Sequence, residues 1–441
     1  MNPEVVLRVI EEQVIKRPLN PAERIVLGQT WNQQTYEQMA EQSGYGDAHL
    51  KDTGYKLWRE ISQALGQRVT KKSLSFVLKE HLKQLSLAAI STNPVETAGS
   101  AIHYPSGPLP PDSPLYVERP PYEGIARLAI QRPGGFLRVK APQKMGKTSL
   151  SLRLIQAVKP LSYQVAYLNL QIIDSGVFAT TETFLKWFCL RVSQELRLKP
   201  QFDDYWDSSM GYKVSSEFYF QEYILEQIDE PIVLFISAAE ELIKHPGIAQ
   251  DFFPLLRYWH EKARWSTAWQ KLRLVITHST EIYVPLKVNQ SPFNIGQVMK
   301  LPCFTAEQVY ELATCYSFED LNTNHAQRLV EFSGGHPYLV NIFFYYLATQ
   351  NHTFDSLIKT AATPAGIYGT HLRNYLALLN REPSLAIALR EVISSSSGVE
   401  LDAVTMYQLE SLGVIKIRDH RALPSCEIYQ TYFAQQLRLV Q

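Results

Sequence analysis

An apolar strand, a tight loop and a helix follow one another over residues 136–155, and this order limits the fold more than any other feature. Residues 136–139 read as the strand, and Gly146, Lys147 and Thr148 open the helix. In such a loop, backbone NH groups and the positive end of a helix converge on an anion, while a lysine adds charge and a hydroxyl holds Mg²⁺. This order of strand, loop and helix predicts a nucleotide-binding loop. The alternative is that Gly-Lys-Thr occurs here by chance.

The first position of the loop departs from the usual pattern G-x-x-x-x-G-K-[ST]. Ala141 stands where glycine is usual, and Pro142 follows it. A side chain is tolerated at this position if the backbone needs no positive φ, since that conformation is the one that favours glycine.

A second apolar run, residues 232–236, lacks the carboxylates that normally follow such a strand. Hydrolysis needs one carboxylate to orient Mg²⁺ and another to activate water, but this run continues into Ser237 and Ala238. Glu240 and Glu241 come next, and we interpret them as solvated acids at the start of a helix. Weaker candidates for a replacement acid are Asp174 and Glu230. We therefore predict a site that holds a nucleotide and hydrolyses it poorly.

Strand-like and helical stretches alternate in the central part of the chain. The runs that read as strands are residues 136–139, 165–170, 232–236 and 272–277. This alternation predicts an α/β fold with a parallel sheet and helices on both faces. Residues 301–380 read as wholly helical. The last part suggests a winged helix, with helices at 383–393 and 401–412 and a hairpin of residues 414–417 and 426–429.

The N-terminal part reads as helices separated by a turn at residues 44–46. One helix face is expected to carry Leu50, Leu57, Trp58, Ile61 and Leu65. Eight prolines between residues 94 and 121 favour an extended spacer. The predicted domains are a helix-turn-helix domain (1–88), a Pro-rich linker (89–114), a nucleotide-binding domain (115–300), a helical lid (301–380) and a winged helix (381–441).

Composition narrows the class of protein. The 441 residues contain 43 Lys plus Arg and 43 Asp plus Glu, so nucleic acid can be attracted only by a local patch. Residues 49–84 form a basic stripe of eight Lys or Arg against three Asp or Glu. The four cysteines show neither zinc-ligand spacing nor a disulfide framework, which favours a reducing cytoplasm. No apolar run is long enough to span a membrane.

Two polar stretches accompany the loop. Residues 274–281 end a strand with hydroxyl side chains, which either sense a terminal phosphate or cap a helix. Residues 333–338 join two helices, where two glycines suit a left-handed cap and a proline suits a first turn. These roles at helix ends explain the two glycines and the proline, but they do not explain His336.

Several motifs in order resemble the AAA-like ATPase domain of bacterial signalling proteins, close to the STAND and archaeal-ATPase branch of P-loop ATPases. The segments that carry the resemblance are residues 116–121, 141–150, 251–257, 290–294 and 334–338, within a span of 115 to about 435. The resemblance implies binding of ATP or ADP with Mg²⁺. It also places Ser237 where Asp is expected and Ala238 where Glu is expected, which argues against turnover.

The same resemblance implies roles for individual residues. Arg119 would lie near the base, and Ser279 or Thr280 near a sensor strand. His336 and Pro337 would contact the nucleotide from the lid. The loop residues expected at the phosphates are Gln143, Lys144, Met145, Gly146, Lys147, Thr148 and Ser149, with Thr148 also at Mg²⁺. Arg257 or Arg264 would reach a neighbouring subunit's phosphate or remain surface residues in ion pairs.

Residues 20–83 resemble the N-terminal helix-turn-helix module of vWA-MoxR associated proteins. The matching segments are residues 23–27, 34–40, 44–45, 57–58 and 69–72. Such a module either binds DNA or serves as an adaptor. The candidate phosphate contacts are Lys51, Lys56, Arg59, Lys71 and Lys72, with His49, Asp52 and Thr53 toward base edges. A solvated helix face is the alternative for the same residues.

Three functions follow from these observations. The first is a cytoplasmic nucleotide-binding switch or adaptor in signalling or defence-type regulation, which acts through a protein partner or a homo-oligomer. The second is a DNA-binding transcriptional regulator or scaffold. The third is an active ATPase that uses an unconventional acidic residue.

Overall fold

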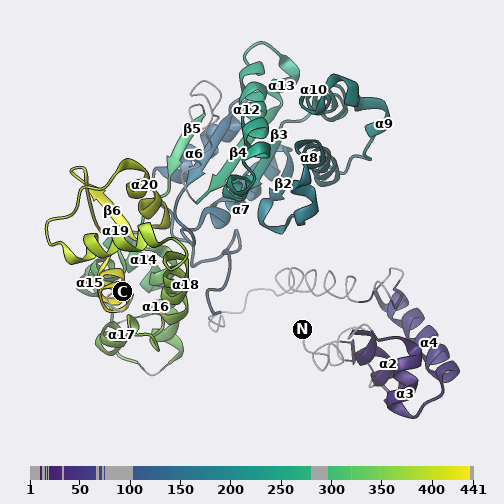
Figure 1. Cartoon of the computed structure of the whole chain (residues 1–441), viewed down its shortest axis with the longest axis horizontal. Helices are drawn as coiled ribbons and strands as arrows, with labels where there is room; N and C mark the ends of the chain where they lie inside the picture. Colours follow the sequence, from purple (N-terminus) through teal and green to yellow (C-terminus); the bar gives the residue numbers. More distant parts are fainter. Residues whose placement is uncertain are drawn as a thin grey trace. The chain divides into compact units, whose positions relative to one another are not determined.

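The chain divides into two compact units, Met1–Ser100 and Ala101–Gln441 (Figure 1). A computed structural model describes residues 10–11, 15, 17, 19–31, 34–65, 69–71, 74, 103–279, 296–318, 320–350 and 352–437. The second unit includes residues 103–114, which the prolines alone suggest to be part of a spacer.

The first unit contains a helix-turn-helix arrangement, as the sequence predicts. Its helices are α2 (Pro21–Trp31), α3 (Tyr36–Ser43) and α4 (Asp47–Leu65). The Thr35 side chain accepts a hydrogen bond from the Gln38 amide, and the Gln38 side chain accepts one from the Thr35 amide. Gly44 ends α3 in the left-handed conformation, with φ 73°. Such caps define both ends of a helix that is too short to be stable alone.

One face of α4 forms much of the core of this unit. The buried residues on that face include Leu50, Leu57, Trp58 and Ile61, as their spacing predicts. The side chain of Leu65, expected on the same face, lies outside the described residues. Trp58 Nε1 donates a hydrogen bond of 3.0 Å to the Tyr36 hydroxyl, which ties α4 to the start of α3.

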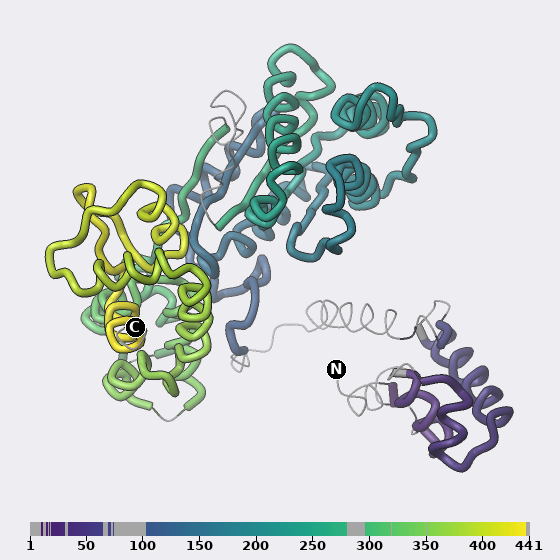
Figure 2. Tube along the Cα trace, in the orientation of Figure 1, coloured from purple at the N-terminus to yellow at the C-terminus, as the bar shows by residue number. Residues whose placement is uncertain are grey.

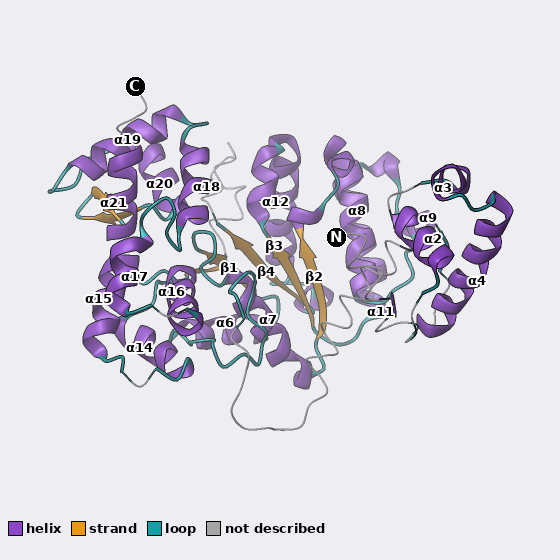
Figure 3. Ribbon diagram, turned by 90° about the horizontal axis from the view of Figure 1, so that it is seen from below, coloured by secondary structure: helices purple, strands orange, loops and turns teal. Residues whose placement is uncertain are grey.

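The second unit is built on a five-stranded parallel sheet with the order β2-β3-β4-β1-β5. The first four strands of this order can be followed in Figure 3. Its strands are β1 (Phe136–Lys140), β2 (Gln164–Asn169), β3 (Ile232–Ser237), β4 (Leu272–His278) and β5 (Gln297–Lys300). The first four confirm the predicted strands. The sequence does not predict β5, because three of its four residues are exposed and this edge strand therefore has no apolar run.

Alternate residues of the central strands separate into two cores. In β3, Ile232, Leu234 and Ile236 belong to the core shared with α8 and α12, whereas Val233 and Phe235 face α6 and α7. Both faces of the sheet are therefore covered by helices, as predicted (Figure 3). The helices of this part are α6 (Tyr122–Gln131), α7 (Lys147–Val158), α8 (Thr181–Glu195), α9 (Phe202–Tyr205), α10 (Tyr212–Phe218), α11 (Leu225–Gln227), α12 (Pro246–Lys262) and α13 (Thr267–Gln270).

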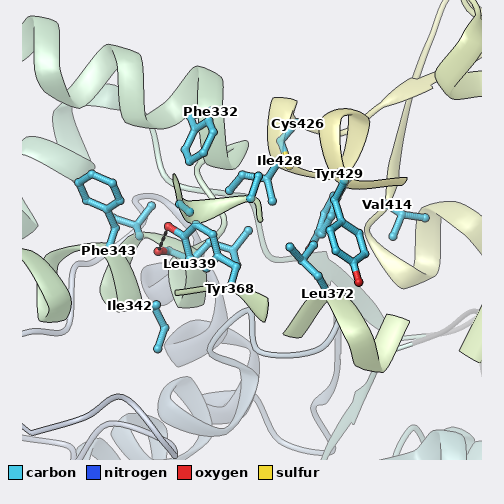
Figure 4. Packing of buried hydrophobic residues seen from close by; sticks show 14 of the residues in the cluster. Phe332, Leu339, Ile342, Phe343, Tyr368, Leu372, Val414, Cys426, Ile428 and Tyr429 are labelled. Carbon is cyan, nitrogen blue, oxygen red and sulfur yellow. Dashed lines mark hydrogen bonds between the residues drawn. The ribbon is translucent and has the colours of Figure 1, made fainter. Parts of the chain in front are cut away.

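The C-terminal helices and a hairpin share a third core (Figure 4). In this core, Leu339 and Tyr368 of the predicted lid pack in the same cluster as Ile428 and Tyr429, and the Tyr368 hydroxyl donates to the Leu339 carbonyl at 2.8 Å. The elements are α14 (Ala306–Cys315), α15 (Thr323–Ser333), α16 (Pro337–Thr349), α17 (Phe354–Ala361), α18 (Gly369–Leu379), α19 (Pro383–Ser394), α20 (Ala403–Leu412), β6 (Ile415–Arg418), β7 (Arg421–Pro424) and α21 (Glu427–Gln436). Among the described residues, no helix is both long and apolar enough to cross a bilayer.

The hairpin differs from its prediction in the second strand. Residues 426–429 do not pair with β6; β7 does, in a register that joins Arg418 to Arg421. The turn consists of Asp419 and His420, with φ of 49° and 62°, and two consecutive positive φ values are typical of a tight two-residue hairpin turn. Cys426 then precedes α21. The two helices and hairpin keep their predicted order, and the winged-helix interpretation stays a prediction.

Two glycines in the first unit provide a test of its packing. A methyl group on Gly54 of α4 would lie 2.2 Å from the Tyr36 hydroxyl, whereas one on Gly28 of α2 meets nothing within 4 Å. Gly54→Ala should therefore displace Tyr36 and cost roughly 1–3 kcal/mol, while Gly28→Ala should stabilise by about 0.5–1 kcal/mol through helix propensity. Hydrogen exchange of α4 amides in the intact protein measures both changes; equal protection in the two variants would contradict this packing.

Candidate nucleotide site

The loop between β1 and α7 adopts the conformation of a phosphate cradle. Lys144 and Gly146 have positive φ values of 61° and 89°. Ala141 is not among the residues with positive φ, so the absence of glycine there causes no backbone strain. Lys144 bears the strain of a left-handed conformation instead, which costs a non-glycine residue about 1 kcal/mol.

Three side chains, those of Arg119, His336 and Lys147, form hydrogen bonds with carbonyl oxygens of this loop. Arg119 Nη1 donates to the Met145 carbonyl at 2.9 Å, and His336 Nε2 contacts the Gln143 carbonyl at 3.1 Å. Lys147 Nζ donates to the carbonyls of the first two loop residues, Ala141 and Pro142, at 2.7 and 2.8 Å. These contacts fix the orientation of the peptide groups.

The backbone amides on the same loop are left without partners. Within the described part of the chain, the NH groups of residues 143–148 donate no hydrogen bond. Unpaired NH groups at the start of a helix form a binding site for an anion. A cavity of about 290 Å³ opens beside them, and its walls include Lys144, Lys147 and Thr148. The residues present therefore fit a polyphosphate.

Lys147 is turned onto its own loop in this structure. Burial lowers the pKa of its ammonium group to about 8, and the negative charge of Glu240 opposes that change. A partly buried ammonium group gains stability from a second negative charge. A phosphate in the cavity would supply that charge and would draw Lys147 away from the two carbonyls.

Arg119 supports the loop from behind, whereas the resemblance suggests a place near the base. Its guanidinium group is buried, bonds the Met145 carbonyl, and would lie 3.3 Å from a methyl group on Gly146. Glu123 accepts a hydrogen bond from the Arg119 amide at 2.9 Å and lies 3.9 Å from its Nε. Arg119 does not line the cavity.

The lid contributes to the site through the start of α16. His336 is buried, which lowers its pKa to about 4, so the ring is neutral and Nε2–H donates to the loop. Pro337 and Asn341 line the cavity. The ammonium group of Lys144 lies 3.8 Å from the centre of the Tyr338 ring, a cation–π contact. Sequence reasoning misses Asn341, although it lies one helical turn after Pro337.

The segment of residues 103–113, here called the strap, forms another wall of the cavity. The Leu109 amide donates to the Ser149 hydroxyl at 3.0 Å, and Arg153 donates to the Ser113 carbonyl at 3.2 Å. The Tyr104 ring packs edge-on against Tyr345 of α16, with the ring centres 5.1 Å apart. The strap precedes α6 and runs beside the lid (Figure 2). Its prolines suggest a spacer, but two hydrogen bonds to its backbone and the contact of its Tyr104 ring hold it against the site.

The carboxyl ends of β3 and β4 carry hydroxyl groups in place of acids. Thr277 Oγ1 donates to Ser237 Oγ at 3.3 Å. Ala238 has a positive φ of 59°, which turns the chain into a 3₁₀-helix, η7 (Ala239–Lys244). The prediction that Glu240 is a solvated acid is wrong, because its carboxylate is half-buried and accepts a hydrogen bond from Ser279. Its Oε2 atom is buried and has no hydrogen-bond partner in the described structure.

The other candidate acids are less well placed. Glu241 pairs with Lys244 at 2.6 Å. Glu230 precedes β3, so it lies at the amino edge of a parallel sheet, opposite the loop. Asp174 follows the outermost strand and is exposed.

Comparison with known proteins identifies the family of the chain. Residues 104–435 match the model of the AAA-like domain. The chain belongs to the AAA-like domain family. Residues 1–81 match the vWA-MoxR associated protein N-terminal HTH. A WD repeat-containing protein of Synechocystis is 23% identical over 296 residues, which are 64% of this chain and 23% of that protein. The chain thus spans less than a quarter of this relative.

Two solved structures are similar to this AAA-like protein, and the first of them shows the same fold. A Walker-type ATPase of Pyrococcus abyssi is 15% identical, with 72% of this chain and 96% of that chain covered and a TM-score of 0.51. The ORC2 protein of Aeropyrum pernix is 14% identical, with 76% and 98% covered and a TM-score of 0.46.

The remaining predicted residues of the AAA-like unit fall in different places. Met145 is buried in the core, so it can offer a ligand only its backbone, and the Gln143 side chain is exposed. Thr280 lies outside the described residues, as do residues 290–294. Arg257 donates to Glu261 within α12 at 2.9 Å.

The candidate DNA contacts of the helix-turn-helix unit are largely engaged elsewhere. Lys51 pairs with Asp47 at 2.6 Å and Lys56 with Asp52 at 2.7 Å, both within α4. Lys71 lies 4.0 Å from the centre of the Tyr36 ring. The other two candidates are Arg59, which is exposed, and Lys72, which lies outside the described residues.

The lowered pKa of Lys147 predicts proton uptake when ATP binds above about pH 8. Below that pH the free protein already carries the proton; above it, the phosphates restore the charge because a nearby anion raises the pKa. At about pH 8.5, the calorimetric binding enthalpy should therefore depend on the ionisation enthalpy of the buffer, and at about pH 7 much less so.

The control for this titration is Lys144→Met, which removes the neighbouring lysine and should keep the uptake. An enthalpy that is independent of the buffer at both pH values would contradict the assignment to Lys147.

Proposed function

We propose that this protein is a nucleotide-responsive switch, in which ATP or ADP with Mg²⁺ binds the loop between β1 and α7 and changes the contacts of the strap and the lid. The observation that carries the proposal is the set of unpaired amides at residues 143–148 beside a cavity walled by strap and lid. A ligand that binds two arrangements with different affinity shifts their populations without any bond being broken.

Contacts between the loop and the C-terminal body support this proposal. A methyl group on Gly413 would lie 2.9 Å from Pro142 Cβ, so the loop packs directly on the turn that precedes β6. The Pro142 carbonyl is one of the two that Lys147 occupies. When Lys147 turns to a phosphate, that carbonyl loses its donor at the point where the loop meets the C-terminal body.

The strap supports a route toward the first unit. Its Leu109 amide bonds Ser149, the residue after the hydroxyl expected at Mg²⁺. The strap is covalently continuous with the chain that leads to the helix-turn-helix unit. A nucleotide that competes with the strap contacts would release the tether of that unit, which then acts as an adaptor toward a protein partner or a second copy of the chain.

Individual residues have distinct tasks in this switch. The amides of the loop and Lys147 would hold the phosphates, and the Thr148 hydroxyl would hold Mg²⁺, which neutralises phosphate charge when bound. Pro337 and Tyr338 would limit access from the lid side. Signalling or defence-type regulation in the cytoplasm is the setting that fits such a switch.

Thermal unfolding with and without nucleotide tests the proposal. ATP or ADP at 100 times the Kd should stabilise the folded protein by about 2.7 kcal/mol and so raise the Tm by several degrees. Lys147→Ala should abolish the rise, whereas Lys159→Ala, which removes the exposed lysine just after the same helix, should leave it intact.

Hydrogen exchange distinguishes a switch from simple binding. With nucleotide, amides of the strap, Leu109 included, should change their protection in the wild type and not in Lys147→Ala. A Tm that responds to neither ATP nor ADP would refute the proposal.

A further inference from the structure

The AAA-like unit contains one carboxylate that none of the contacts described so far explains. Ser237 and Ala238 leave the end of β3 without an acid, yet the chain reverses there. The left-handed turn at Ala238, with φ 59°, and the following 3₁₀-helix η7 return Glu240 toward the end of β4. Its Oε1 accepts the hydrogen bond from Ser279, the residue that directly follows β4.

The sheet places this carboxylate at the edge where the phosphate loop begins, although Glu240 is not one of the residues that line the cavity. β4 lies between β3 and β1 in the strand order, and the Ala141 amide donates to the His278 carbonyl at 3.3 Å. Ser279 is therefore next to the residue that pairs with the start of the loop. Glu240 is held at the same edge of the sheet as Lys147, whose pKa its charge raises against the effect of burial.

The second oxygen of Glu240 has no protein partner. Oε2 is buried and makes no hydrogen bond within the described structure. A buried carboxylate oxygen without a donor is costly, so sites of this kind receive water, a metal ion or a ligand. The neighbouring Glu241 differs, because its carboxylate is satisfied by Lys244.

We propose that Glu240 replaces the missing strand-end acid and acts as the general base for slow cleavage of bound ATP, with Ser279 as the residue that positions it. This inference rests on the proposed switch function and adds the step that resets it. Glu240 reaches this edge of the sheet from a 3₁₀-helix, and the hydrogen bond from Ser279 holds it there. The second acid, which normally orients Mg²⁺, is still missing.

The reaction is the hydrolysis of ATP to ADP and inorganic phosphate. The oxygen of a water molecule bonds to the terminal phosphorus, and the bond from that phosphorus to the bridging oxygen breaks. The electron pair of the broken bond leaves with ADP. The proton of the water passes to Glu240 Oε2 and then to the phosphate. No oxidant or further reactant is needed.

The matched pair Glu240→Gln and Glu241→Gln tests the assignment. General base catalysis contributes about 10²–10⁴-fold, so Glu240→Gln should lower single-turnover phosphate release by about 100-fold or more. Glu241→Gln should leave the rate unchanged. Both variants should keep the rise in Tm with ATP, because the loop amides and Lys147 are intact.

Nucleotide content gives a readout that does not depend on turnover rate. After incubation with ATP and removal of free nucleotide, chromatography should find ADP on the wild type and on Glu241→Gln, and ATP on Glu240→Gln. Ser279→Ala removes the positioning hydrogen bond and should slow release by a smaller factor, about 3–10-fold. This variant tests the same site if Glu240→Gln does not fold.

Each outcome decides between the two proposals. A wild type that binds ATP and keeps it uncleaved, or equal release from the two Gln variants, would overturn the role of Glu240 and leave the switch in place. Failure of ATP to raise the Tm at all would remove the switch and the base together.

Discussion

The phosphate loop holds its shape because its carbonyl oxygens accept hydrogen bonds from its own Lys147 and from two side chains distant in sequence, and the whole site depends on this. Arg119, His336 and Lys147 each bond a different part of the loop. A buried carbonyl without a donor would cost about 1–3 kcal/mol, so these contacts fix which side of each peptide faces inward. The amides are left for an anion. The ability to bind one is therefore a property of the lid and the segment before α6 as much as of the loop.

The fold was largely predictable because its main signals are local. β3 is buried on both faces, so its sequence is an unbroken apolar run. The residues that cap α3 directly flank the helix in the sequence. Where burial is one-sided or absent, the signal disappears: β5 has only Met299 buried. The second strand of the hairpin was predicted a few residues too late, because the turn is made by Asp419 and His420, which adopt positive φ without a glycine to mark it.

Only those parts of the site that are formed by residues adjacent in sequence could be predicted. Lys147 and Thr148 follow from a single motif, and the absence of acids at Ser237 and Ala238 from the neighbouring strand. The position of Glu240 depends on a left-handed alanine and on a hydrogen bond to Ser279, 39 residues away. The position of the strap could not be predicted for the same reason. Its prolines correctly indicate an extended chain, but they do not indicate that the Leu109 amide bonds Ser149. Such features depend on tertiary contacts that a periodicity or a motif does not contain.

The common core of the lid and the hairpin has a mechanical consequence. Side chains from α16 and α21 belong to one buried cluster, so a movement of one of these elements would be shared by the other (Figure 4). The C-terminal body contacts the loop at two points, His336 on Gln143 and Gly413 on Pro142. In the proposed switch, a small shift at these two points would become a larger displacement at the far end of the body, where another molecule could detect it.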